Sequence, residues 1–77
     1  MAGEFKVTLK ALRVNADLEL KGAAEALGVT IQTVRNWENY NTFPNLMQLR
    51  RICEVYHCSL DNIFIPDQLA KSENEDN

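Results

Sequence analysis

Several residue types that build other kinds of small protein are scarce in this chain. Its 77 residues include two cysteines and one histidine. A disulfide scaffold needs a dense, even set of cysteines, and structural zinc needs four ligands at regular spacing. Cys53, His57 and Cys58 lie close in sequence, but no fourth ligand accompanies them. The sequence therefore predicts no metal and no disulfide, and both cysteines are expected to be buried free thiols in a reducing compartment.

Long apolar runs are missing too. The longest are a few residues, whereas a membrane-spanning helix needs about 20. Met1-Ala2-Gly3-Glu4 lacks the basic start and the apolar core of a signal peptide. His57 beside a cysteine resembles a nucleophile–base pair in composition only. We therefore expect a cytoplasmic protein that is not an enzyme, with no membrane partner, no small-molecule substrate and no cofactor.

An excess of positive charge is also missing, since the formal net charge is −3. Part of the reason is the end of the chain, because residues 72–77 hold three acidic side chains and no apolar one. Without them, eight basic and eight acidic residues remain. We expect a single, electrically neutral domain over residues 1–66, followed by an acidic, disordered tail over residues 67–77.

The chain does contain two short helix patterns joined by a glycine, between residues 23 and 39. Small residues at 23, 24 and 26 suit a helix that a neighbour approaches closely. Gly28 supplies the left-handed position that ends a helix, and Thr30 suits the cap of the next. This is the layout of the helix-turn-helix, whose second helix enters the DNA major groove. The alternative is an ordinary corner between two helices of a small bundle.

The second helix of this pair has an apolar side. At about 100° per residue, Val34 and Trp37 fall together, with Glu38 beside them. Trp37 is therefore expected to anchor the core rather than to stack on bases, with Leu49 and Ile52 as neighbours.

The opposite side carries polar groups that suit DNA. Gln and Asn can bond adenine through two hydrogen bonds, Arg can do so to guanine, and an apolar side chain can contact a thymine methyl. The residues expected to read bases are Ile31, Gln32 and Asn36. The residues expected to contact the DNA backbone are Thr30, Arg35, Asn39, Tyr40 and Asn41. For each polar residue taken alone, a solvated helix surface is the alternative.

Further motifs stand on both sides of this pair. Leu9-Lys10-Ala11-Leu12-Arg13 precedes it; Pro44-Asn45-Leu46, Leu49, Ile52 and Ser59-Leu60-Asp61-Asn62-Ile63-Phe64 follow it. Together with two stretches of the pair itself, these motifs make the chain resemble the Cro/phage-repressor type of helix-turn-helix domain, also called XRE-like. The two stretches are Ala24-Glu25-Ala26-Leu27-Gly28-Val29-Thr30 and Thr33-Val34-Arg35-Asn36-Trp37-Glu38-Asn39. The resemblance runs from about Leu9 to Phe64. It implies an all-α, five-helix lambda-repressor-like fold and double-stranded DNA as the partner. It also supports an ion pair between Arg13 and Glu38, where an unpaired carboxylate beside the core would be costly.

The chain departs from that family where phosphates are usually bound. The family usually has Gln where Leu20 stands and Gly where Tyr40 stands, and its next loop often carries Lys or Arg. Here Asn41-Thr42-Phe43 has no charge. Because phosphate neutralisation supplies most non-specific affinity, one copy of this neutral domain is expected to bind DNA weakly.

The remaining segments are interpreted as scaffold. A first helix is expected from a Thr8 cap through about Asn15, and the first helix of the motif from about Leu20 to Leu27. Asn45 is expected to cap a fourth helix. A short fifth helix, Leu60 to Phe64, is expected to end before Pro66.

These features predict a transcriptional regulator of phage-repressor or Cro-like character that places a helix over about 31–39 in the major groove. A homodimer on a two-fold operator, or a protein partner, would supply the missing affinity. The candidate dimer surface is Phe64-Ile65-Pro66 with Leu69. The alternative is a protein-interaction module, antirepressor- or antitoxin-like, which the neutral charge and the expected exposure of Tyr40 and Phe43 would suit.

Overall fold

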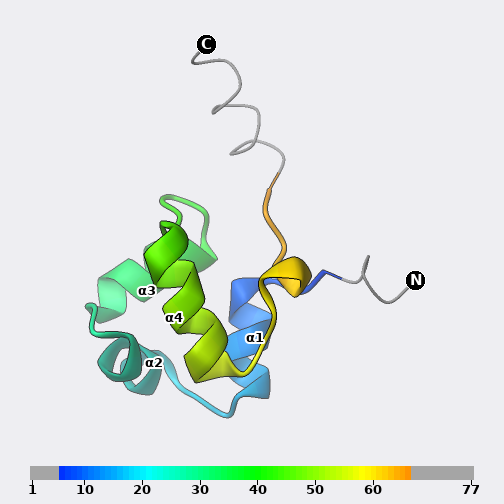
Figure 1. The fold of residues 1–77 in the computed structure, drawn as a ribbon. Helices are drawn as coiled ribbons and strands as arrows, with labels where there is room; N and C mark the ends of the chain where they lie inside the picture. The colour runs from blue at the N-terminus through cyan, green and yellow to red at the C-terminus, as the bar shows by residue number, and fades with distance from the viewer. Residues whose placement is uncertain (1–5, 67–77) are drawn as a thin grey trace.

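A computed structural model describes residues 6–66 as an all-helical domain (Figure 1). Its elements are α1 (Leu9–Asn15), α2 (Leu20–Leu27), α3 (Ile31–Glu38), α4 (Leu46–Tyr56) and the single 3-10 turn η2 (Leu60–Asn62). The helix α4 runs through the middle of the molecule, with α2 and α3 on one side and α1 on the other (Figure 1). The expected tail, and Leu69 within it, lie outside the described residues.

Three of the helices begin at a side-chain cap that satisfies a free backbone amide. The Thr8 hydroxyl accepts from the Ala11 amide at 3.1 Å at the start of α1. At the start of α4 the Asn45 side chain accepts from the Gln48 amide, and the Gln48 side chain accepts from the Asn45 amide, both at 2.8 Å. Thr30 has the same role for α3. These caps set the helix starts at the residues that the sequence predicts.

The core forms where the apolar sides of all four helices meet. Its members are Leu9, Leu12, Ala23, Trp37, Ile52, Tyr56 and Ile63. Leu49 and Phe43 are partly buried against this cluster. Burial of Trp37 among these residues agrees with its expected place in the core.

The expected fifth α-helix over Leu60 to Phe64 is wrong. Only one 3-10 turn forms, and Ile63 after it is extended (φ −83°, ψ 127°). The cause is a contact with the other end of the domain: Val7 donates to the Asn62 carbonyl at 2.7 Å, and Phe64 donates to the Val7 carbonyl at 2.9 Å. This isolated parallel bridge between Val7 and Ile63 takes up the backbone groups that a helix would have used.

Within residues 6–66, the helices are all too short or too polar to cross a membrane.

Candidate nucleic-acid interface

The turn between α2 and α3 is built around Gly28. Gly28 is left-handed at φ 74°, ψ 31°, and the Val29 amide donates to the Ala24 carbonyl at 3.0 Å. Thr30 then caps α3 by accepting from the Thr33 amide at 3.1 Å. A side chain at Gly28 would meet nothing within 4 Å, so the glycine is there for its backbone conformation and not for space. The two helices are thereby fixed in the helix-turn-helix arrangement.

The side of α3 that faces the domain is fully packed. Val34 is 1% exposed and Trp37 is 4% exposed. Because these two residues fill the inner side, the rotation of the helix about its axis is fixed, and its opposite side faces solvent.

The outward side of α3 brings the expected base-reading residues together. Ile31 and Gln32 are exposed and Asn36 is half-buried. The Gln32 Nε2 donates to the Asn36 Oδ1 at 3.1 Å, so the two amides are joined before any ligand is present. Arg35 and Asn39 are also exposed, on the same helix and just beyond its end.

The segment after α3 holds the two remaining residues that were expected to contact the DNA backbone. Tyr40 is left-handed at φ 63°, the conformation that the family's usual glycine would adopt freely. Its ring meets Phe64 edge-on, with 6.2 Å between ring centroids and 71° between ring planes. Burial, and then the Glu38 carboxylate, raise the pKa of the Tyr40 phenol. Asn41 is exposed, and its amide donates to the Asn36 carbonyl at 2.9 Å.

Tyr40 and Phe43 are half-buried, so the expectation that both aromatics are exposed is wrong. Phe43 packs against the core cluster, and Tyr40 contacts Phe64. The contact with Phe64 joins residues far apart in sequence, and no local pattern signals it. Leu20, where the family usually has Gln, is half-buried at the start of α2.

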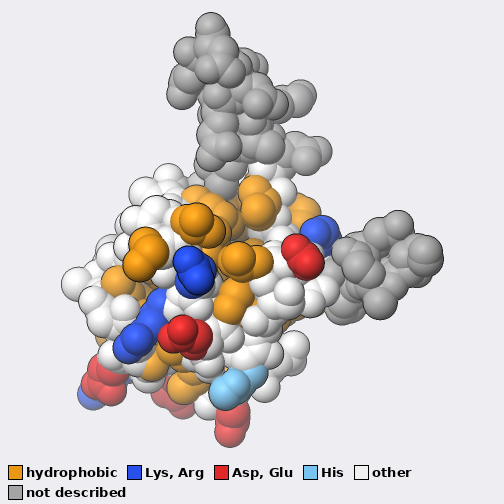
Figure 2. All heavy atoms as spheres, viewed as in Figure 1, with side chains coloured by type: hydrophobic (Ala, Val, Ile, Leu, Met, Phe, Trp, Pro, Cys, Tyr) orange, Lys and Arg blue, Asp and Glu red, His pale blue; other side chains and the backbone are white. Residues whose placement is uncertain are grey.

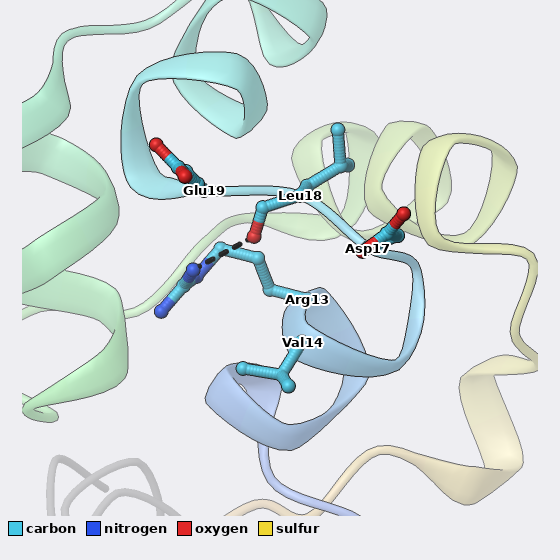
Figure 3. Close-up of a pocket in the computed structure, with 5 residues that line it drawn as sticks. All are labelled: Arg13, Val14, Asp17, Leu18 and Glu19. Atoms are coloured by element: carbon cyan, nitrogen blue, oxygen red, sulfur yellow. Dashed lines mark hydrogen bonds between the residues drawn. The ribbon is translucent and has the colours of Figure 1, made fainter.

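An ion pair fixes the end of α3 to α1. Arg13 Nε donates to Glu38 Oε2 at 2.6 Å and Nη2 donates to Oε1 at 3.3 Å. The third nitrogen, Nη1, donates to the Leu18 carbonyl at 2.9 Å, as the dashed line in Figure 3 shows. The hydrogen bond to Glu38 raises the pKa of Arg13. The pair therefore positions α3 relative to α1 and to the segment that leads into α2.

The hollow drawn in Figure 3 lies beside this pair. It encloses about 310 Å³, and Arg13, Val14, Asp17, Leu18 and Glu19 line it. Arg13 already donates from all three nitrogens, to Glu38 and to Leu18. Its guanidinium therefore holds the corner between α1 and α2 together.

The cysteines and the histidine lie at the end of α4. Cys53 and Cys58 are free thiols and are half-buried rather than buried. Burial, and a hydrogen bond with Cys53, raise the pKa of Cys58 to about 12. His57 ends α4 in the left-handed conformation at φ 58°. Among residues 6–66, no group of three or more His, Cys, Asp or Glu side chains is arranged to hold a metal ion.

Besides Ile31 on α3, exposed apolar side chains lie at the start of α4 and after η2. Leu46 and Met47, at the start of α4, are 61% and 73% exposed, and Phe64 and Ile65 are 38% and 48% exposed. Figure 2 shows hydrophobic side chains gathered over the start of α4 and the segment that follows η2. Pro66 is half-buried.

Comparison with known proteins agrees with this geometry. A family model described as helix-turn-helix matches residues 9–63. The chain therefore belongs to the XRE/Cro-type helix-turn-helix family, whose members are DNA-binding transcriptional regulators and not typically enzymes. No curated protein and no solved structure matches the chain.

Proposed function

We propose that the protein is a sequence-specific regulator of the phage-repressor or Cro-like kind, which inserts α3 into the major groove of an operator. The observation that carries this proposal is the division of α3 into two sides. Val34 and Trp37 are buried, while Gln32, Arg35 and Ile31 face solvent. Amide, guanidinium and apolar groups on one accessible helix side are the groups that read base edges.

The roles along this side follow from the chemistry and position of each group. Ile31 meets a thymine methyl, and Gln32 with Asn36 contacts base edges. Arg35 and Asn39 donate to phosphates on either side of the groove. The Thr30 hydroxyl, exposed at the start of α3, and the Asn41 side chain add neutral donors.

The Tyr40 hydroxyl donates to the DNA backbone, while the Tyr40 ring stays against Phe64.

The domain is electrically neutral, and this limits the DNA affinity of a single copy, because counterion release grows with the number of phosphates neutralised. We therefore propose a homodimer that binds two half-sites about one helical turn apart. The exposed side chains of Phe64 and Ile65 form its proposed contact surface.

Selection of binding sites from a random duplex library tests the proposal. We expect a two-fold symmetric site, with affinity that falls as salt rises. A purely protein-binding module of the antirepressor or antitoxin kind would enrich no sequence. Its complex with a partner, held by an apolar surface, would also be less sensitive to salt.

A further inference from the structure

We propose that Gln32 and Asn36 act as one unit, in which Asn36 positions Gln32 to read a single adenine. This inference rests on the proposed function and deepens it. It replaces two independent base readers with one reader and one positioning residue. The hydrogen bond from Gln32 Nε2 to Asn36 Oδ1, at 3.1 Å, carries it.

The hydrogen-bonding groups of the two amides divide the roles. Gln32 gives one of its two N–H groups to Asn36 and keeps a second N–H and its carbonyl oxygen. Adenine presents an acceptor at N7 beside a donor at N6, so one N–H and one carbonyl match it. The Asn36 Oδ1 already accepts a hydrogen bond from Gln32. Asn36 therefore keeps its N–H donors but has only part of its acceptor capacity left.

Reach and burial point in the same direction. Gln32 is exposed and has one methylene more than Asn36, which is half-buried. Asn36 is therefore the fixed partner and Gln32 is the one that extends toward the groove.

The pairing also changes the entropy of binding. A free glutamine side chain loses rotamer freedom when it engages a base, and that loss subtracts from affinity. A bond already present in the free protein restricts Gln32 beforehand. Removal of Asn36 should therefore harm the same base contact as removal of Gln32 does.

A double-mutant cycle on the selected site tests this coupling. Gln32→Ala should lower the preference for one A·T pair in each half-site by about 5- to 150-fold. Asn36→Ala should relax preference at that same pair. The double variant should bind within about twofold of Gln32→Ala alone. Circular dichroism and thermal unfolding of each variant establish that the fold is kept.

Asn36→Asp separates positioning from direct base contact. It keeps an oxygen to accept from Gln32 but loses the Asn36 donors, and its charge weakens binding to all sequences alike. The adenine preference should therefore survive in Asn36→Asp. Asn39→Ala is the matched control, because Asn39 also carries an amide and is exposed at the end of the same helix. This variant should weaken binding without altering the adenine preference.

Two results overturn the inference in distinguishable ways. If the wild-type domain enriches no sequence, the proposed function and the coupling fail together. If it enriches a site but Gln32→Ala and Asn36→Ala relax different base pairs, with additive losses, only the coupling fails. Loss of the adenine preference in Asn36→Asp would likewise show that Asn36 reads a base directly.

Discussion

The guanidinium of Arg13 binds both carboxylate oxygens of Glu38, at 2.6 and 3.3 Å, and the two side chains are each 9% exposed. A nearly buried pair of this kind is costly to break from one side, because the remaining charge is left without a partner. Glu38→Ala should therefore reduce the free energy of unfolding by about 3–5 kcal/mol. Urea unfolding followed by tryptophan fluorescence measures it. The double variant Arg13→Met, Glu38→Ala should recover a large part of the loss. A double variant no more stable than Glu38→Ala would contradict this account of the pair.

Stability should fall at alkaline pH, because the buried Tyr56 and the half-buried Cys58 resist ionisation. Burial first, and then the Glu38 carboxylate, raise the pKa of Tyr56 from 10.0 to about 12. The pKa of Cys58 is raised from 9.0 to about 12. The folded state thus holds protons that the unfolded chain releases. Stability is complete below about pH 9 and is lost as pH rises toward about 12. Unfolding free energies between about pH 8 and 11 test this, and Tyr56→Phe should make the decline shallower. An unchanged decline in that variant would remove Tyr56 as a cause.

The left-handed backbone of Tyr40 costs stability, and the contact of its ring with Phe64 offsets that cost. A left-handed conformation costs a residue with a side chain about 1–2 kcal/mol, and glycine adopts it freely. Tyr40→Ala should therefore be less stable than Tyr40→Gly, since both lose the contact with Phe64 but only alanine keeps the strain. Thermal unfolding of the two variants makes the comparison. Phe64→Ala removes the ring contact while it leaves the residue at position 40 unchanged. Equal stability of the alanine and glycine variants would show that this backbone conformation is not kept.

Arg35 should contribute affinity without sequence preference. Its exposed guanidinium on α3 is expected to meet a phosphate, so Arg35→Ala should weaken binding to all duplexes. The slope of log affinity against log salt should fall by about 1 for each Arg35 lost, or about 2 for the proposed homodimer. Titrations of operator and random duplexes at several salt concentrations measure both quantities. A loss confined to the operator would mean that Arg35 contacts a base instead.

Local patterns in the sequence predicted the helical part of the fold because the signals are contained in neighbouring residues. Thr8, Thr30 and Asn45 each cap the helix that follows them, and Gly28 ends α2 in the left-handed conformation. Helical periodicity was also sufficient to orient α3, because it placed Trp37 on the inner side.

The features that the sequence did not reveal depend on contacts between distant residues. The segment after Leu60 is extended because it pairs with Val7, more than fifty residues earlier, and no property of that segment alone indicates this. The burial of Tyr40 depends on Phe64 in the same way. In the candidate site, helical spacing placed Gln32 and Asn36 on one side, whereas their hydrogen bond depends on side-chain rotamers.

In the proposed complex, α3 presents Gln32 and Asn36 to DNA while Trp37 stays in the core. Trp37 is the only tryptophan and is 4% exposed, so its fluorescence reports the rotation of the helix directly. Titration of the protein with its selected duplex, with anisotropy of a labelled strand recorded in parallel, follows burial and binding together. We expect blue-shifted emission in the free protein that changes little while anisotropy rises to saturation. Red, solvent-like emission that DNA quenches strongly would contradict it, because Trp37 would then lie on the side that meets the groove.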